Sequence, residues 1–289
     1  MANTSPIKPS TTSAKTSAKE ASLSDSLSST FAAIVIPLSF VVAYLIYRFI
    51  LGDCSHYVDC NHEKPLPGDI LAIIHAGGII VPIIIGLLIL VIAMAFERFL
   101  TITKASGKGS VAKFVAKVKM LISRGEIDAA LAEADRQQGS VGNVVKAGLL
   151  KYKEVDGNYS LDQDKKLLAI QKDIEETTQL EMPMLERNLV IIATIASIAT
   201  LMGLLGTVIG MINAFSALAN AGAPDAVKLA SGISEALINT AFGIGTSALA
   251  IILYNFFTSK IDGLTYGIDE VGYSITQSFA AKANKNAEV

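Results

Sequence analysis

The chain has 289 residues, of which 51% are hydrophobic and 17% charged, and its mean hydropathy is +0.49. A soluble protein with an ordinary polar surface does not have this composition, so we expect a polytopic membrane protein. The net charge of −2 does not indicate a nucleic-acid-binding protein, which would carry an excess of Lys and Arg. The sequence also lacks a Walker loop, a dinucleotide fingerprint, a zinc-protease motif and a nucleophile elbow, so we expect no enzyme, no cofactor and no metal.

The N-terminal part predicts a tail followed by a membrane anchor. Residues 1–30 are rich in Ser, Thr and Ala and carry three Lys, which is typical of a disordered, weakly basic tail. The apolar run 31–51 is longer than the roughly 7–15 residues of a signal-peptide core. No clear small-x-small cleavage site follows it, so we expect a retained transmembrane helix.

The following loop, residues 52–69, contains both cysteines in the stretch CSHYVDCNH. If the loop faces an oxidising compartment, the first interpretation is a disulfide between Cys54 and Cys60. A metal site is the second interpretation, because His56 and His62 complete four ligands of suitable type. Unpaired loop residues are the third interpretation.

Three further segments are long enough to cross a bilayer, which takes about 20 apolar residues. They are residues 70–96, 186–215 and 233–258. The long insert 97–185 has apolar residues at helical spacing throughout, and we expect a helical scaffold with a solvated face. Its helices are predicted at 111–122, 126–136, 139–149 and 161–185, the last running straight into the next span.

The distribution of Lys and Arg predicts the orientation of the spans. Fourteen of the 24 lie in the insert 97–185, and six lie in the terminal tails 1–30 and 259–289. The loop 52–69 and the hairpin 216–232 contain one each. The pattern places both tails and the insert on the cytoplasmic side of the membrane and the two short loops on the outer side. The predicted fold is therefore all-α, with four transmembrane helices whose long members extend into a helical cytoplasmic domain.

The last two spans carry a stripe of small and polar residues that a helix facing only lipid does not need. Helices that pack closely or line a polar path have such stripes. The expected packing positions are Gly203, Gly206, Gly210 and Gly243. The polar positions are Thr207, Glu235, Asn239 and Thr240.

Three stretches make the chain similar to a known family. The second span contains Gly77-Gly78 and ends in Glu97-Arg98-Phe99, and the third contains Gly203-Leu-Leu-Gly-Thr-Val-Ile-Gly. The fourth begins Gly232-Ile-Ser-Glu-Ala-Leu and has Thr240 five residues after the glutamate. With these motifs, residues 70–260 resemble the proton-channel family that includes ExbB, TolQ and, more distantly, MotA.

The chain departs from the family pattern in two places. The helix 31–51 and its cysteine loop are additional to the usual three spans, which favours an ExbB-type over a TolQ-type subunit. Position 239 is Asn where the family pattern leads us to expect a small apolar residue, which adds a hydrogen-bonding group to the stripe.

The resemblance implies a homo-oligomeric ring, a pentamer in the best-known cases, in the lipids of the bacterial inner membrane. The ring would surround an ExbD-like single-span partner and would use proton-motive force to act on a TonB-like protein. Thr207, Glu235, Asn239 and Thr240 would line the proton path. Glu235 lies near the outer start of its helix, so the chain lacks a central acid, and the resemblance implies that the partner supplies an Asp.

The residues alone leave other interpretations open. In one alternative the two threonines only donate to backbone carbonyls, and Glu235 forms an ion pair with Lys228 of a neighbouring subunit. A TolQ-like subunit or another motor of the family is the alternative function. A structural or adaptor membrane protein is the alternative from a different class.

Overall fold

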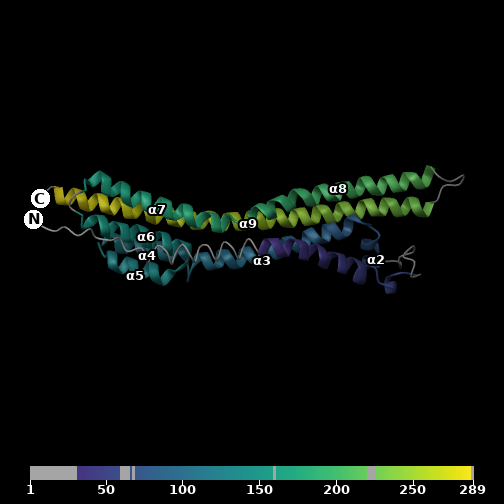
Figure 1. Ribbon diagram of the computed structural model, residues 1–289, viewed down its shortest axis with the longest axis horizontal. Coiled ribbons are helices and arrows are strands. Elements are labelled where there is room, and N and C mark those ends of the chain that lie inside the picture. Colours follow the sequence, from purple (N-terminus) through teal and green to yellow (C-terminus); the bar gives the residue numbers. More distant parts are fainter. Residues whose placement is uncertain (1–30, 59–65, 67–68, 159–160, 220–225, 288–289) are drawn as a thin grey trace, which may run out of the picture.

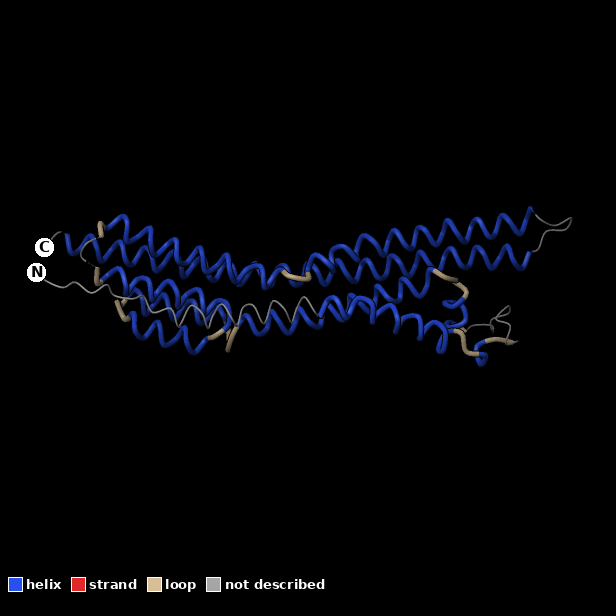
Figure 2. Tube along the Cα trace, in the orientation of Figure 1, coloured by secondary structure: helices blue, strands red, loops and turns tan. Residues whose placement is uncertain are grey.

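The computed structural model describes residues 31–58, 66, 69–158, 161–219 and 226–287. Every regular element within these residues is a helix, and the molecule is elongated (Figures 1 and 2). Within the described ranges, four helices are long and apolar enough to cross a membrane. The predicted all-α polytopic membrane fold is therefore confirmed. The expectations for residues 1–30 and for the tip of the hairpin, 220–225, lie outside the described residues.

The helices differ greatly in length. An N-terminal helix, Phe31–Leu51, ends in a π-helical segment and is followed by the short 3-10 helix η2. That π-helical segment is η1 Ile46–Leu51, and the elements after it are η2 Cys54–His56, α2 Ile70–His75, α3 Ile80–Ser106, α4 Val111–Ser123, α5 Ile127–Gln137, α6 Gly139–Asp156, α7 Gln163–Glu186, α8 Leu189–Ala219 and α9 Ala226–Ala287.

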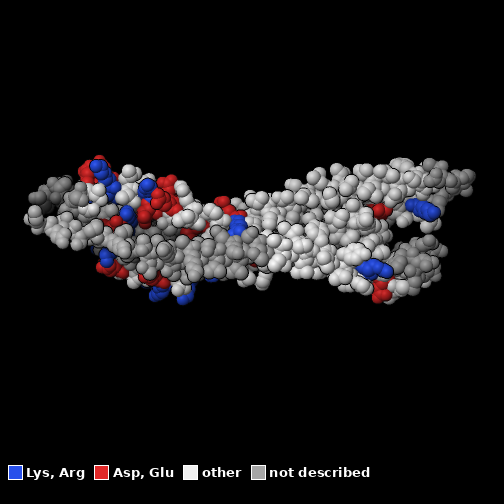
Figure 3. All heavy atoms as spheres, in the orientation of Figure 1, with Lys and Arg blue, Asp and Glu red and all other residues white. Residues whose placement is uncertain are grey.

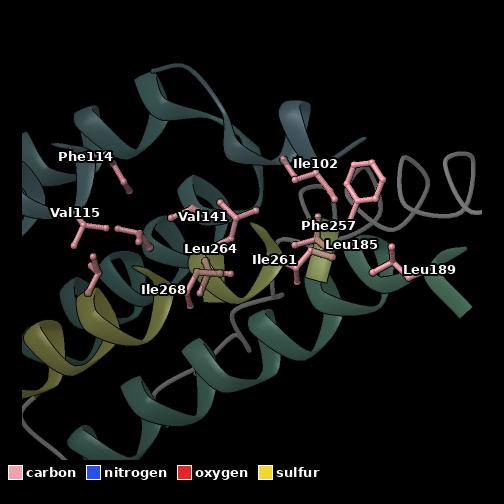
Figure 4. Packing of buried hydrophobic residues seen from close by; sticks show 14 of the residues in the cluster. Ile102, Phe114, Val115, Val141, Leu185, Leu189, Phe257, Ile261, Leu264 and Ile268 are labelled. Atoms are coloured by element: carbon pink, nitrogen blue, oxygen red, sulfur yellow. The ribbon is translucent and has the colours of Figure 1, made fainter. Parts of the chain in front are cut away.

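Charge divides the molecule into two halves. On the face drawn in Figure 3, Lys, Arg, Asp and Glu gather over one half and at the junction, and the other half is almost free of them except near its far end. We call these the charged half, which contains α4 to α7 and the end of α9, and the apolar half, which contains α8, the start of α9 and the N-terminal helix. In Figure 4, buried side chains of α3, α4, α6, α7 and α9 form the core near the junction and in the charged half.

The expected single span 70–96 is divided in the structure. Helix α2 ends at His75 and α3 begins at Ile80, with Gly78 between them at φ +71°. Only glycine adopts this conformation without strain, which explains the break. Helix α3 then continues ten residues past the expected end, to Ser106.

The expected straight passage from the insert into the third span is also broken. Helix α7 ends at Glu186, and α8 begins at Leu189 after Asn188, which has φ +64°. Asn tolerates the left-handed conformation better than most residues. By contrast, α9 is one helix of 62 residues, so the stretch expected as a separate tail, 259–289, continues the fourth span as far as Ala287.

The N-terminal helix lies against α3. A Cβ on Gly86 would be 2.6 Å from the ring of Phe40, so this glycine provides the recess for the aromatic side chain. Farther along, the ring of Tyr47 stacks on His75 with centroids 4.5 Å apart. The additional helix is thus attached to both parts of the broken second span.

Candidate functional site

The α8–α9 pair forms the most extensive helix contact, and glycines bring the two backbones together. A Cβ on Gly203 would lie 3.1 Å from the Cα of Gly243, and a Cβ on Gly243 would lie 2.7 Å from the Cα of Gly203. At Gly210 an added Cβ would be 2.7 Å from the backbone nitrogen of Ala236. Small residues permit this close approach in membrane helices.

The two threonines of the predicted lining lie on opposite helices, and both hydroxyls donate to backbone carbonyls. Thr207 Oγ1 donates to Leu204 O at 2.6 Å. Thr240 Oγ1 lies 3.1 Å from Ala236 O on its own helix and 3.5 Å from Gly203 O on α8. A hydroxyl that donates in this way keeps its acceptor sites available for water or for a partner's proton.

Asn239 is completely buried and connects three helices. Its Nδ2 donates to Gly77 O, in the turn between α2 and α3, at 2.8 Å. Its side chain packs beside Gly206 of α8, while its buried Oδ1 has no hydrogen-bond partner among the described residues. The residue therefore faces the interior of the subunit and fixes the broken second span to α9.

Glu235 lies one turn before Asn239 and faces the same break. A Cβ on Gly78 would lie 2.6 Å from Glu235 Oε1, so the glycine makes room for the carboxylate. Asn213 of α8 donates to Glu235 Oε2 at 3.3 Å. The structure brings the carboxylate together with Gly78 and Asn213, whereas Thr207 and Thr240 are bonded elsewhere.

Polar residues surround His75 next to this site. Tyr57 Oη lies 2.7 Å from His75 Nδ1, and Tyr47 Oη donates to His75 O at 3.3 Å. Burial raises the pKa of Tyr57 to about 12, so its hydroxyl stays protonated in neutral solution. Asp69, which caps α2, is bonded to His56 at 2.8 Å, and that bond lowers the pKa of its carboxyl group.

The cysteine loop is described only in part. Cys54 is disulfide-bonded. Its expected partner Cys60, and His62 of the alternative metal site, lie outside the described residues. Among the residues that are described, no group of three His, Cys, Asp or Glu is placed to hold a metal ion.

Several neighbours of the site were not predicted from the sequence. Asn213 follows the glycine motif by three residues, but a single polar residue near a helix end has no obvious partner. The contact of Gly77 and Gly78 with α9 joins residues some 160 positions apart, and no helical periodicity predicts such a contact. The Gly-Gly pair was the available signal, because two adjacent glycines weaken a helix.

Comparison with known proteins places these helices in context. Residues 136–270 match the MotA/TolQ/ExbB proton channel family. The Tol-Pal system protein TolQ of Pseudomonas aeruginosa is 30% identical over 141 residues, which are 46% of this chain and 61% of that protein. A biopolymer transport protein ExbB homolog of Methanothermobacter thermautotrophicus is 29% identical over 197 residues, or 68% and 65% of the two chains.

The biopolymer transport protein ExbB of Salmonella typhimurium is 33% identical over 84 residues, which are 29% of this chain and 34% of that protein. The chain thus spans less than two thirds of the length of each of these relatives. Both ExbB and TolQ proteins are among the relatives, at similar identity.

Proposed function

Because this chain is a member of the MotA/TolQ/ExbB proton channel family, we propose that it is the ExbB-type proton-channel subunit of a TonB–ExbB–ExbD complex. It would use proton-motive force to energise transport across the outer membrane. We further propose that it lies in the bacterial inner membrane with both termini and the charged half in the cytoplasm.

One observation carries the proposal: the polar groups of the α8–α9 pair include no acid at the level of the threonines. Glu235 lies 5 residues before Thr240, which is roughly 7–8 Å along the helix. The sequence contains no Asp or Glu from 189 to 215 or from 236 to 258. Hydroxyls hold water but do not ionise at ordinary pH, so in this proposal another chain provides the group that binds and releases the proton.

The partner we propose is therefore a single-span, ExbD-like protein with an Asp in its membrane helix. In a ring of subunits, a pentamer in this proposal, Thr207 and Thr240 would face that Asp, and Glu235 would mark the outer entrance. Asn239 has a different role in this arrangement, because its side chain is enclosed within one subunit.

The test replaces single hydroxyls in the complex with its partner. Thr240→Val and Thr207→Val keep the side-chain shape and remove the polar group, so both should lose most proton flux into proteoliposomes and most energised siderophore uptake. Thr194→Val is the matched control, because Thr194 also donates to a backbone carbonyl of α8, at 2.7 Å, but lies near the opposite end of the helix. The ring should assemble normally in all three variants.

Normal flux and uptake in both variants would contradict the channel proposal and favour a structural or adaptor protein. Loss of flux with normal siderophore uptake, accompanied by defects of the outer envelope, would identify a Tol-Pal subunit instead. That alternative rests on the TolQ relatives.

A further inference from the structure

A cavity lies at the junction of the two halves, away from the contact between Gly203 and Gly243. It has a volume of about 300 Å³, and the ends of α3 and α7 and the start of α6 enclose it. The polar residues of its lining include Glu97, Arg98, Lys104, Ser140 and Arg187.

The lining of this cavity has an excess of positive charge. It contains three cationic side chains and one carboxylate, Glu97. Arg98 pairs with that carboxylate, and Thr101 and Asn188 donate to it as well, so Glu97 is already satisfied within the protein. Lys104, by contrast, is an exposed residue of the lining and makes no ion pair with any described residue.

The start of α6 contributes backbone hydrogen-bond donors to the lining of the cavity. No side chain caps the first turn of this 18-residue helix. The first amides of a helix lack partners within it, and the helix dipole favours an anion beside them.

Ser140, in the first turn of α6, is a separate indication of a ligand. The residue is only 7% exposed and lines the cavity, yet no hydrogen bond joins its hydroxyl to any described residue. Its hydroxyl is open to the cavity and can bond a ligand there.

We propose that this cavity binds a phosphate group, held by Lys104, Arg187, the Ser140 hydroxyl and the first amides of α6. The long apolar run of α3 ends just before Glu97, and that of α8 begins at Leu189, so the cavity lies where a bilayer changes from hydrocarbon to headgroups. Basic pockets at this level suit lipid headgroups. The phosphodiester of an anionic phospholipid and free inorganic phosphate share the required chemistry.

The experiment measures binding by the full-length chain, and so does not depend on the proposed proton conduction. Native mass spectrometry would measure how much phosphatidylglycerol or phosphatidylcholine the chain retains. In a second arm, melting in detergent would be followed as inorganic phosphate replaces chloride at constant ionic strength. Lys104→Gln should weaken binding about fivefold, and Ser140→Ala should also weaken it.

Lys108→Gln is the matched control, because Lys108 is exposed, lies four residues farther on beyond the end of α3, and does not line the cavity. Preferential retention of phosphatidylglycerol that Lys104→Gln reduces would identify a lipid ligand. A phosphate-dependent rise in melting temperature without lipid preference would identify the free anion. Equal effects of the two lysine substitutions, or no binding in either arm, would overturn the proposal.

Discussion

At Asn239 a single amide joins three parts of the apolar half. The side chain donates to Gly77 O, packs beside Gly206, and leaves its own Oδ1 buried without a partner. A buried polar group that is left unsatisfied costs about 1–3 kcal/mol. The bond to Gly77 therefore has to offset a penalty that a small apolar residue would not incur.

Asn239→Ala should destabilise the subunit by about 1–2 kcal/mol, measured by unfolding in detergent. The substitution leaves the Gly77 carbonyl without its donor and opens a cavity, and the loss of the unsatisfied Oδ1 offsets only part of that cost.

Asn213→Ala is the control for this substitution. Asn213 is exposed and donates to a partly exposed carboxylate, so its change should cost less than about 0.5 kcal/mol. If Asn239→Ala were as stable as the unmodified chain, the amide would not hold the turn before α3.

Among the elements, α8 and α9 depend on backbone contact at their glycines. Gly243 lies against Gly203 Cα and Ala199 O, whereas Gly245, two residues later in the same helix, has nothing within 4 Å of the place where a Cβ would be. A Gly→Ala substitution therefore adds the same methyl group at both positions, against backbone atoms at Gly243 and into open space at Gly245.

Gly243→Ala should separate the two helices and destabilise the protein by about 1–3 kcal/mol, because both close neighbours are backbone atoms that cannot rotate away. Gly245→Ala should be neutral or stabilise the helix by up to about 1 kcal/mol. Thermal unfolding of the two variants in one detergent measures the difference. Equal effects would mean that the glycine contact does not limit the approach of α8 and α9.

The apolar runs in the sequence predicted the four spanning helices, because a run of this length has one stable arrangement in a bilayer. The breaks in the helices were harder to predict. The two left-handed residues at the breaks have distant neighbours, since Gly78 lies beside Glu235 and Asn188 donates to Glu97. Those contacts are tertiary, and local sequence patterns do not contain them.

The same limit applies to the candidate site. Thr207, Glu235 and Thr240 were identifiable as polar residues in apolar helices. The inward position of Asn239 depends on the turn at Gly77, which the expectation of a continuous second span did not include. The lining of a ring by the threonines stays a prediction, since it concerns an assembly of several chains.

Across the whole molecule, Arg98 connects the two halves. It is 1% exposed, pairs with Glu97, and donates to the carbonyls of Met184 and Leu185 at the end of α7, each at 3.2 Å. Helix α7 ends at Glu186 and α8 begins at Leu189. The guanidinium group therefore links α3 to the chain just before the break between α7 and α8.

Arg98→Met should destabilise the protein by about 3–5 kcal/mol, because it removes the cation from a half-buried carboxylate and leaves two carbonyls without their donor. Arg136→Gln is the control, since Arg136 is 72% exposed and its ion pair with Glu133 is worth at most about 1 kcal/mol. Unfolding would measure stability, and limited proteolysis would report opening near Asn188. A stable, protease-resistant Arg98→Met variant would show that packing alone joins the halves.

The uninterrupted course of α9 has a mechanical consequence. The helix begins in the apolar half and ends among the core residues of the charged half, and its 62 residues extend over about 93 Å. The part beyond Gly243 is about 66 Å long, so a tilt of about 5° at the glycine contact would carry its end sideways by about 6 Å. A small tilt of α9 beside the threonines would therefore displace the far end of the helix by about the width of a side chain.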